Sequence, residues 1–159
     1  MKEICVVVDV SGSMCTMGKP SVLGNVMQTL STLQNFYDES QRIIFPKMQW
    51  DGGRETLEAL VEKFDGKNVL LLTDGYALSD FCRTSSSVKK FIAANKKSLF
   101  VVLCGGDALD VSVFKKDFGE LRVVNARDIL YAVELLPSNS GSQSAAQSSD
   151  SDSGEDGWE

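Results

Sequence analysis

The chain has 159 residues, 43% of them hydrophobic, and both values are normal for a single globular domain. It contains no histidine, which excludes every mechanism that uses an imidazole as base, nucleophile or metal ligand. The formal net charge is −6, and the lack of a basic surplus argues against nucleic acid as the main partner.

The negative charge is concentrated near the C-terminus. Residues 137–159 contain five acidic residues, eight serines and no basic residue, which leaves 17 acidic and 16 basic residues in the rest of the chain. A segment of this composition buries too little apolar surface to offset its ordering entropy, so we expect it to be disordered. We therefore predict a folded domain over residues 1–136 and an acidic tail over residues 137–159.

Other features of the composition concern location. None of the four cysteines forms a CxxC pair, so we do not expect a zinc site. Asp9 interrupts the only early apolar run, which is therefore unlike a signal peptide, and no run approaches the ~18 residues of a membrane span. Free thiols without an export signal lead us to expect a cytoplasmic protein with no membrane partner.

Strand and helix patterns alternate along the chain. In chain order, the sequence predicts a strand at 4–8, a helix at 23–37, a strand at 42–45, a helix at 56–64, a strand at 69–72, a helix at 88–92, a strand at 99–103, a helix at 111–118, a strand at 121–124 and a helix at 129–136. The strands at 4–8, 69–72 and 99–103 are continuously apolar, as expected when both faces of a sheet are covered. The alternation predicts an α/β fold: a three-layer, doubly wound, mainly parallel sheet with helices on both faces.

Oxygen-bearing side chains follow two of these strands. Asp9, Ser11 and Ser13 come at the end of the first strand, and Asp74 follows the strand at 69–72. Ligands of such sheets bind beyond the carboxyl ends of the strands, and a right-handed crossover brings both ends to one rim. These hard oxygen donors suit Mg²⁺ or Mn²⁺, with water completing the shell. Without a cation, the two carboxylates would repel each other, and one would tend to hold a proton.

The same residues resemble a known family. The segment DVSGS at 9–13 resembles the DxSxS motif of von Willebrand factor A (vWA) domains, which carries the metal-ion-dependent adhesion site (MIDAS). LLLTDG at 70–75 is similar to the second aspartate motif of the family, GGRETLEAL at 52–60 to its GGTxTxxAL stretch, and LFVVLCGGDALD at 99–110 to the strand and glycine turn that follow. The resemblance covers roughly residues 2–136 and implies a vWA, Rossmann-like fold with a MIDAS-type metal site.

One position departs from the family. Arg54 follows the double glycine where the family has its metal-linked threonine, and Thr56 falls on the second threonine of the motif. An arginine cannot ligate a cation and would repel one. Two outcomes stay open: Thr56 or a water replaces the missing ligand, or the metal is weakened or lost. We therefore predict Mg²⁺ or Mn²⁺ held weakly. The short spacing before Asp51 also predicts that the family's antiparallel edge strand is shortened or missing.

The family resemblance implies a binding module without catalysis, in which the metal accepts a carboxylate from a protein partner. Small cytoplasmic members often serve as adaptors for AAA-type ATPases, which makes a MoxR-type AAA ATPase a candidate partner. One alternative is a metal-free scaffold in which Arg54 itself receives the partner's acid. Another is a phosphotransferase of the haloacid dehalogenase type, although Ser11 stands where that family needs a second acid. No GxGxxG follows the first strand, which excludes a Rossmann oxidoreductase.

Overall fold

A single sheet runs through the centre of the molecule. The computed structural model describes residues 2–36, 41–110, 112, 114 and 121–138. Its strands are β1 (Lys2–Asp9), β2 (Ile43–Ile44), β3 (Lys47–Trp50), β4 (Asn68–Thr73), β5 (Leu99–Leu103) and β6 (Arg122–Asn125). They follow the order β2-β1-β4-β5-β6, with β3 also pairing with β1, and every pairing between described strands is parallel. The predicted mainly parallel, Rossmann-like α/β fold is therefore confirmed.

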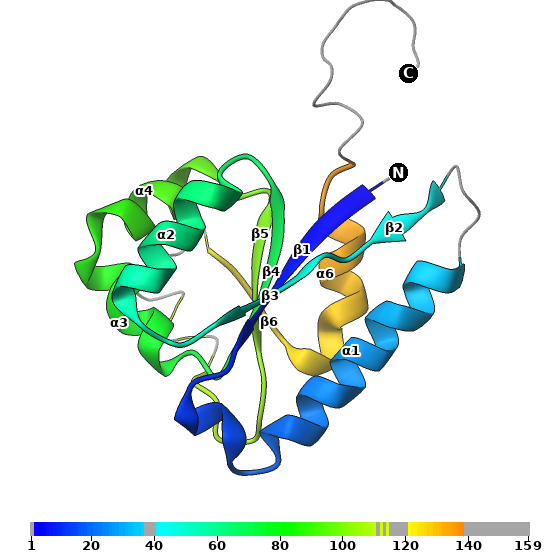
Figure 1. Ribbon diagram of the computed structural model, residues 1–159, viewed down its shortest axis with the longest axis horizontal. Coiled ribbons are helices and arrows are strands. Elements are labelled where there is room, and N and C mark those ends of the chain that lie inside the picture. The colour runs from blue at the N-terminus through cyan, green and yellow to red at the C-terminus, as the bar shows by residue number, and fades with distance from the viewer. Residues whose placement is uncertain (1, 37–40, 111, 113, 115–120, 139–159) are drawn as a thin grey trace, which may run out of the picture.

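Helices cover both faces of this sheet (Figure 1). They are α1 (Lys19–Phe36), α2 (Arg54–Phe64), α3 (Tyr76–Thr84), α4 (Ser86–Ala94) and α6 (Ile129–Leu135), with short 3₁₀ turns η1 (Gly12–Cys15) and η3 (Ala126–Asp128). Figure 1 shows α2, α3 and α4 on one side of the strands and α1 and α6 on the other. The three predicted layers are thus present.

Alternate residues of the central strands face opposite helical layers. Val7 and Leu71 pack into the apolar cluster under α2, α3 and α4, whereas Val6 and Leu70 pack into the cluster under α1 and α6. All four are buried. Because both faces of the sheet are covered, the side chains on both faces are apolar. Apolar and polar residues therefore do not alternate along these strands, which explains the continuous apolar runs in the sequence.

The edge beside β1 differs from the predicted strand at 42–45. The chain pairs with β1 twice, first through β2 and then through β3, on either side of Pro46. Proline has no N–H to donate, but its carbonyl accepts a hydrogen bond from the Val6 N–H at 2.7 Å. The predicted strand was therefore too short, since pairing continues to Trp50. No antiparallel strand occurs in the described part of the chain, in line with the expectation for this edge.

One helix was not predicted, and two predictions cannot be assessed. Helix α3 has nine residues, and its buried apolar residues Leu78 and Cys82 are one helical turn apart. Two positions are too few for a helical pattern to be recognised in the sequence. Most of the predicted helix at 111–118, all but residues 112 and 114, and nearly all of the predicted tail lie outside the described residues. At the start of the tail, the Asn68 side-chain amide donates a hydrogen bond to the carbonyl of Pro137 at 2.7 Å, which connects the end of the domain to the start of β4.

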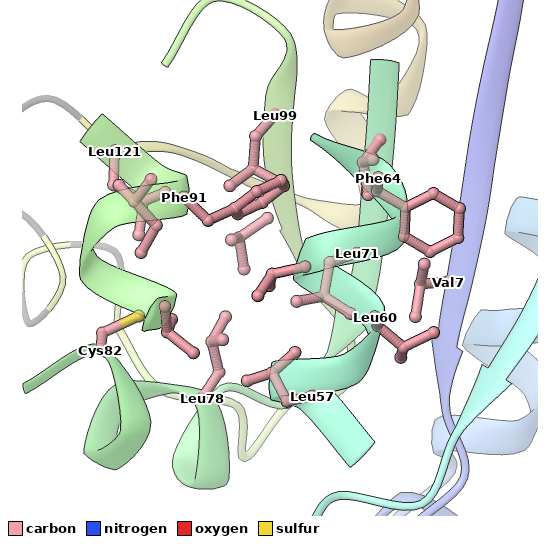
Figure 2. A pocket seen from close by; sticks show the side chains of 15 residues that line it. Val7, Leu57, Leu60, Phe64, Leu71, Leu78, Cys82, Phe91, Leu99 and Leu121 are labelled. Atoms are coloured by element: carbon pink, nitrogen blue, oxygen red, sulfur yellow. The ribbon is translucent and has the colours of Figure 1, made fainter. Parts of the chain in front are cut away.

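A small cavity remains under α2, α3 and α4 (Figure 2). Its volume is about 30 Å³, and its lining is apolar, with Val7, Leu57, Leu78 and Phe91 among its walls. A space of this size fits about one water molecule, but a water here would find no polar partner. We therefore interpret the cavity as a dry packing gap of the core, separate from the carboxylates of the predicted site.

The first prediction concerns the core. Val7→Asp would place a carboxylate among apolar side chains, at a position that is only 3% exposed. We expect a loss of at least about 3 kcal/mol in the free energy of unfolding, measured by urea denaturation, because an unpaired buried charge must be neutralised or exposed. The control is Leu130→Asp at an exposed position of α6. Wild-type stability for Val7→Asp would contradict the central place of β1.

Candidate functional site

Asp9 links the end of β1 to the end of β4. One oxygen of its carboxylate, Oδ1, accepts a hydrogen bond from the Ser11 backbone N–H at 2.9 Å, and Oδ2 accepts one from the Thr73 hydroxyl at 2.7 Å. The residue is fully buried. Its carboxylate therefore holds the serine loop against the neighbouring strand end.

The two serines and Asp74 lie together beyond these strand ends. The Oγ atoms of Ser11 and Ser13 are 3.4 Å apart. The Ser13 hydroxyl is close enough to Asp74 to lower the pKa of that carboxyl, whose Oδ1 also accepts from the Tyr76 backbone N–H at 3.4 Å. The parallel sheet thus brings the predicted Asp9, Ser11, Ser13 and Asp74 into one cluster of oxygen atoms.

The double-glycine loop lies directly against this cluster. A Cβ atom on Gly52 would fall 2.7 Å from the Cβ of Ser11 and 3.8 Å from Oδ1 of Asp9. Gly52 also has a φ of +89°, a conformation that other residues rarely adopt. Only glycine therefore allows the backbone after β3 to approach the serine loop this closely.

Lys19 is the residue of the site that the sequence analysis missed. Its ammonium contacts three acceptors: the Ser13 carbonyl at 2.8 Å, Oδ2 of Asp74 at 3.1 Å and Oδ1 of Asp107 at 3.1 Å. The side chain is only 1% exposed. An ammonium has three N–H donors, so each acceptor can take one. Asp107 follows β5, and in the described part of the chain its Oδ1 has no partner besides this ion pair.

This ion pair determines the electrostatics of the cluster. Burial alone would lower the pKa of Lys19, but the carboxylates of Asp107 and Asp74 beside it outweigh burial and raise it. Burial likewise acts to raise the pKa of Asp74, but the Ser13 hydroxyl and the Lys19 ammonium hold it below its ordinary value of 3.8. The sequence analysis did not foresee this lysine, whose ammonium supplies a compensating positive charge beside Asp74.

Thr56 and Arg54 lie beside the cluster rather than in it. The Thr56 hydroxyl donates to Oδ1 of Asp51 at 2.5 Å. The guanidinium of Arg54 points to α3, where it donates to the Thr84 hydroxyl at 2.6 Å and lies 5.0 Å from the centre of the Phe81 ring. The structure thus gives neither residue a contact with Ser11, Ser13 or Asp74 among its described hydrogen bonds and ion pairs.

Two signals in the sequence could have identified the missed residues. Lys19 is the first residue of α1, where the helix dipole disfavours a cation, so a lysine there indicates an acidic neighbour. Asp107 follows the third central strand, and the carboxyl ends of parallel strands meet at one rim. The rule that located Asp9 and Asp74 therefore applies to Asp107 as well.

The donor set determines which ligands the cluster can hold. No three His, Cys, Asp or Glu side chains are grouped for metal binding in the described residues, so any cation must rely on two carboxylates and two hydroxyls. Oxygen donors of this kind fit Mg²⁺ or Mn²⁺, and water has to complete the shell. Cys104 lies nearby, but burial and the neighbouring carboxylates raise its pKa to about 12, so its thiol stays neutral and is a poor ligand.

Comparisons with protein-family models, with curated proteins and with solved structures gave no match. None of the helices in the described part of the chain combines the length and apolarity that crossing a membrane requires. The functional interpretation therefore rests on the fold and on the geometry of the oxygen cluster.

The pKa of Asp74 generates the second prediction. Because this pKa is lower in the folded protein than in the unfolded chain, Asp74 contributes stability that is present above about pH 4 and lost as pH falls through the folded pKa. The free energy of unfolding of Asp74→Asn should fall less steeply than that of the wild type from about pH 5 to about pH 2. Glu62→Gln on the exposed side of α2 serves as control. Parallel curves for Asp74→Asn and wild type would rule out the ion pair.

Proposed function

We propose that the chain is a metal-dependent protein-interaction module without catalytic activity. The observation that supports this most strongly is the cluster of carboxylate and hydroxyl oxygens at the carboxyl ends of β1 and β4. Ser11 and Ser13 would hold Mg²⁺ or Mn²⁺ with their hydroxyls, and Asp9 and Asp74 would balance its charge. When bound, the cation offers an acidic side chain of a partner protein a positive point of attachment.

The surroundings of the cluster support a protein as the partner. Val10, Met17 and Tyr76 lie on the loops and helix start around it and are 42%, 71% and 51% exposed. Met17 also has a φ of +56°, which is uncommon for a residue other than glycine. Exposed apolar and aromatic side chains around a charged centre are typical of protein interfaces.

The geometry of Asp9 disfavours the phosphotransferase alternative. A nucleophilic aspartate needs an accessible oxygen, but Asp9 is fully buried and both of its oxygens accept hydrogen bonds. Its neighbour two residues on is Ser11, which cannot replace a carboxylic acid as proton donor. A binding role agrees better with this arrangement than acyl-phosphate chemistry does.

The contacts of Arg54 likewise disfavour the metal-free alternative. Its guanidinium is engaged by Thr84 and Phe81, and the Asp80 carboxylate lies 4.0 Å away. A partner's acid placed on Arg54 would therefore bind beside α3 and not at the oxygen cluster. The proposal consequently assigns recognition to the cluster.

The third prediction tests metal binding by titration calorimetry with Mg²⁺ and Mn²⁺. The wild-type chain should bind one cation with a dissociation constant on the order of 0.1–1 mM, since few charged ligands are available. Ser13→Ala and Asp9→Ala should abolish the binding, whereas Glu62→Ala should leave it unchanged. Circular dichroism verifies the fold of each variant. If Asp9→Ala disturbs folding, because Asp9 is buried, the result for Ser13→Ala decides the test. No heat of binding in the wild type would contradict the proposal.

The fourth prediction concerns the arginine that replaces the family's threonine. Because its guanidinium lies over Phe81 on α3, Arg54→Thr should change the affinity for Mg²⁺ by less than about twofold. The same titration measures it. A tightening of tenfold or more would mean that the arginine faces the cation in solution and lowers its affinity.

A further inference from the structure

Lys19 is enclosed in a site that fixes its position. Its ammonium has three acceptors, and its aliphatic stem lies against the backbone of Gly105, where an added Cβ would fall 2.6 Å from the Lys19 Cγ. Gly105 also has a φ of +106°, so a glycine is needed there on both counts. The stem of Lys19 is therefore packed against the loop after β5, and its side chain is only 1% exposed.

The formal charge of the cluster depends on this lysine. Asp9 and Asp74 of the cluster, together with Asp107 on the other side of Lys19, carry three negative charges. Lys19 reduces this total to −2, which one divalent cation neutralises. Without Lys19 the total would be −3, and a metal-loaded site would stay negative. A negative site repels an acidic side chain, whereas a neutral one with an accessible cation does not.

We propose that Lys19 is a built-in counter-cation that lowers the metal affinity of the site and keeps the metal-loaded site neutral toward an acidic partner. The inference rests on the proposed function. The ammonium and any cation held at Asp74 share that carboxylate, so each weakens the other's hold by like-charge repulsion. Lys19 thus acts on metal affinity through its charge at Asp74 and does not itself contact the partner.

A purely structural role for Lys19 predicts a different result. The residue joins the loops after β1, β4 and β5, and a role confined to holding these loops would make every substitution weaken metal binding. The counter-cation role instead predicts effects of opposite sign for Lys19 and for its partly exposed partner Asp107. Removing the Lys19 charge should tighten binding, whereas removing the Asp107 charge should weaken it.

The test is Mg²⁺ titration calorimetry on the full chain. Lys19→Met keeps the stem over Gly105 and Lys19→Gln keeps a donor for the Ser13 carbonyl, and both should tighten Mg²⁺ binding on the order of tenfold. Asp107→Asn should weaken it several-fold. Lys90→Met, which removes an exposed charge from α4, should have no effect.

Each outcome separates the inference from the function on which it rests. Unchanged or weaker binding in folded Lys19→Met and Lys19→Gln overturns the counter-cation role while leaving metal binding intact. Tighter binding in either variant supports it, so the loss of one variant to misfolding does not remove the test. If the wild type, all variants and Mn²⁺ controls show no binding, the proposed function itself fails and the inference fails with it.

Discussion

The buried ammonium of Lys19 is the charge on which the electrostatics of the site depend. It contacts the carbonyl of Ser13 and the carboxylates of Asp74 and Asp107, which lie on the loops that follow β1, β4 and β5. Burying an ion pair is costly, and removing one partner of such a pair typically costs about 3–5 kcal/mol. Apolar side chains of similar volume could fill this position at a lower cost in desolvation, so the buried charges are not explained by stability alone.

The parallel sheet is what makes this centre possible. Since β1, β4 and β5 are adjacent and parallel, their carboxyl ends lie at one rim, and the acids that follow them come close together without any loop having to be long. The helices on both faces bury the strands, which fixes the strand ends from which the polar residues extend. The apolar core and the polar rim are thus different parts of the same fold. The cavity of Figure 2 belongs to the core.

Much of this architecture could be predicted from the sequence, for identifiable reasons. Continuous apolar runs identify strands buried on both faces, and oxygen side chains after β1 and β4 locate the rim. Shorter patterns were not recognised. Helix α3 has buried apolar residues over one turn only, and Pro46 interrupts the pattern between β2 and β3. Lys19 was missed because a lysine beside a proline resembles a surface residue, and only the folded loops show which carboxylates face it. The direction of the Arg54 side chain could not be predicted from the sequence either, since it could have pointed to the rim or to α3.

Nuclear magnetic resonance would test the central claim most directly, by following backbone amide shifts of the ¹⁵N-labelled chain during addition of Mg²⁺. The account predicts saturable shifts confined to the loops of the cluster, at Ser11, Ser13, Gly52, Gly75 and Gly105, because these amides adjoin the carboxylates, the serines and the lysine. The rest of the sheet should be unaffected. Shifts that fail to saturate, or that occur only among the acidic residues after position 149, would show that the cluster does not bind the cation.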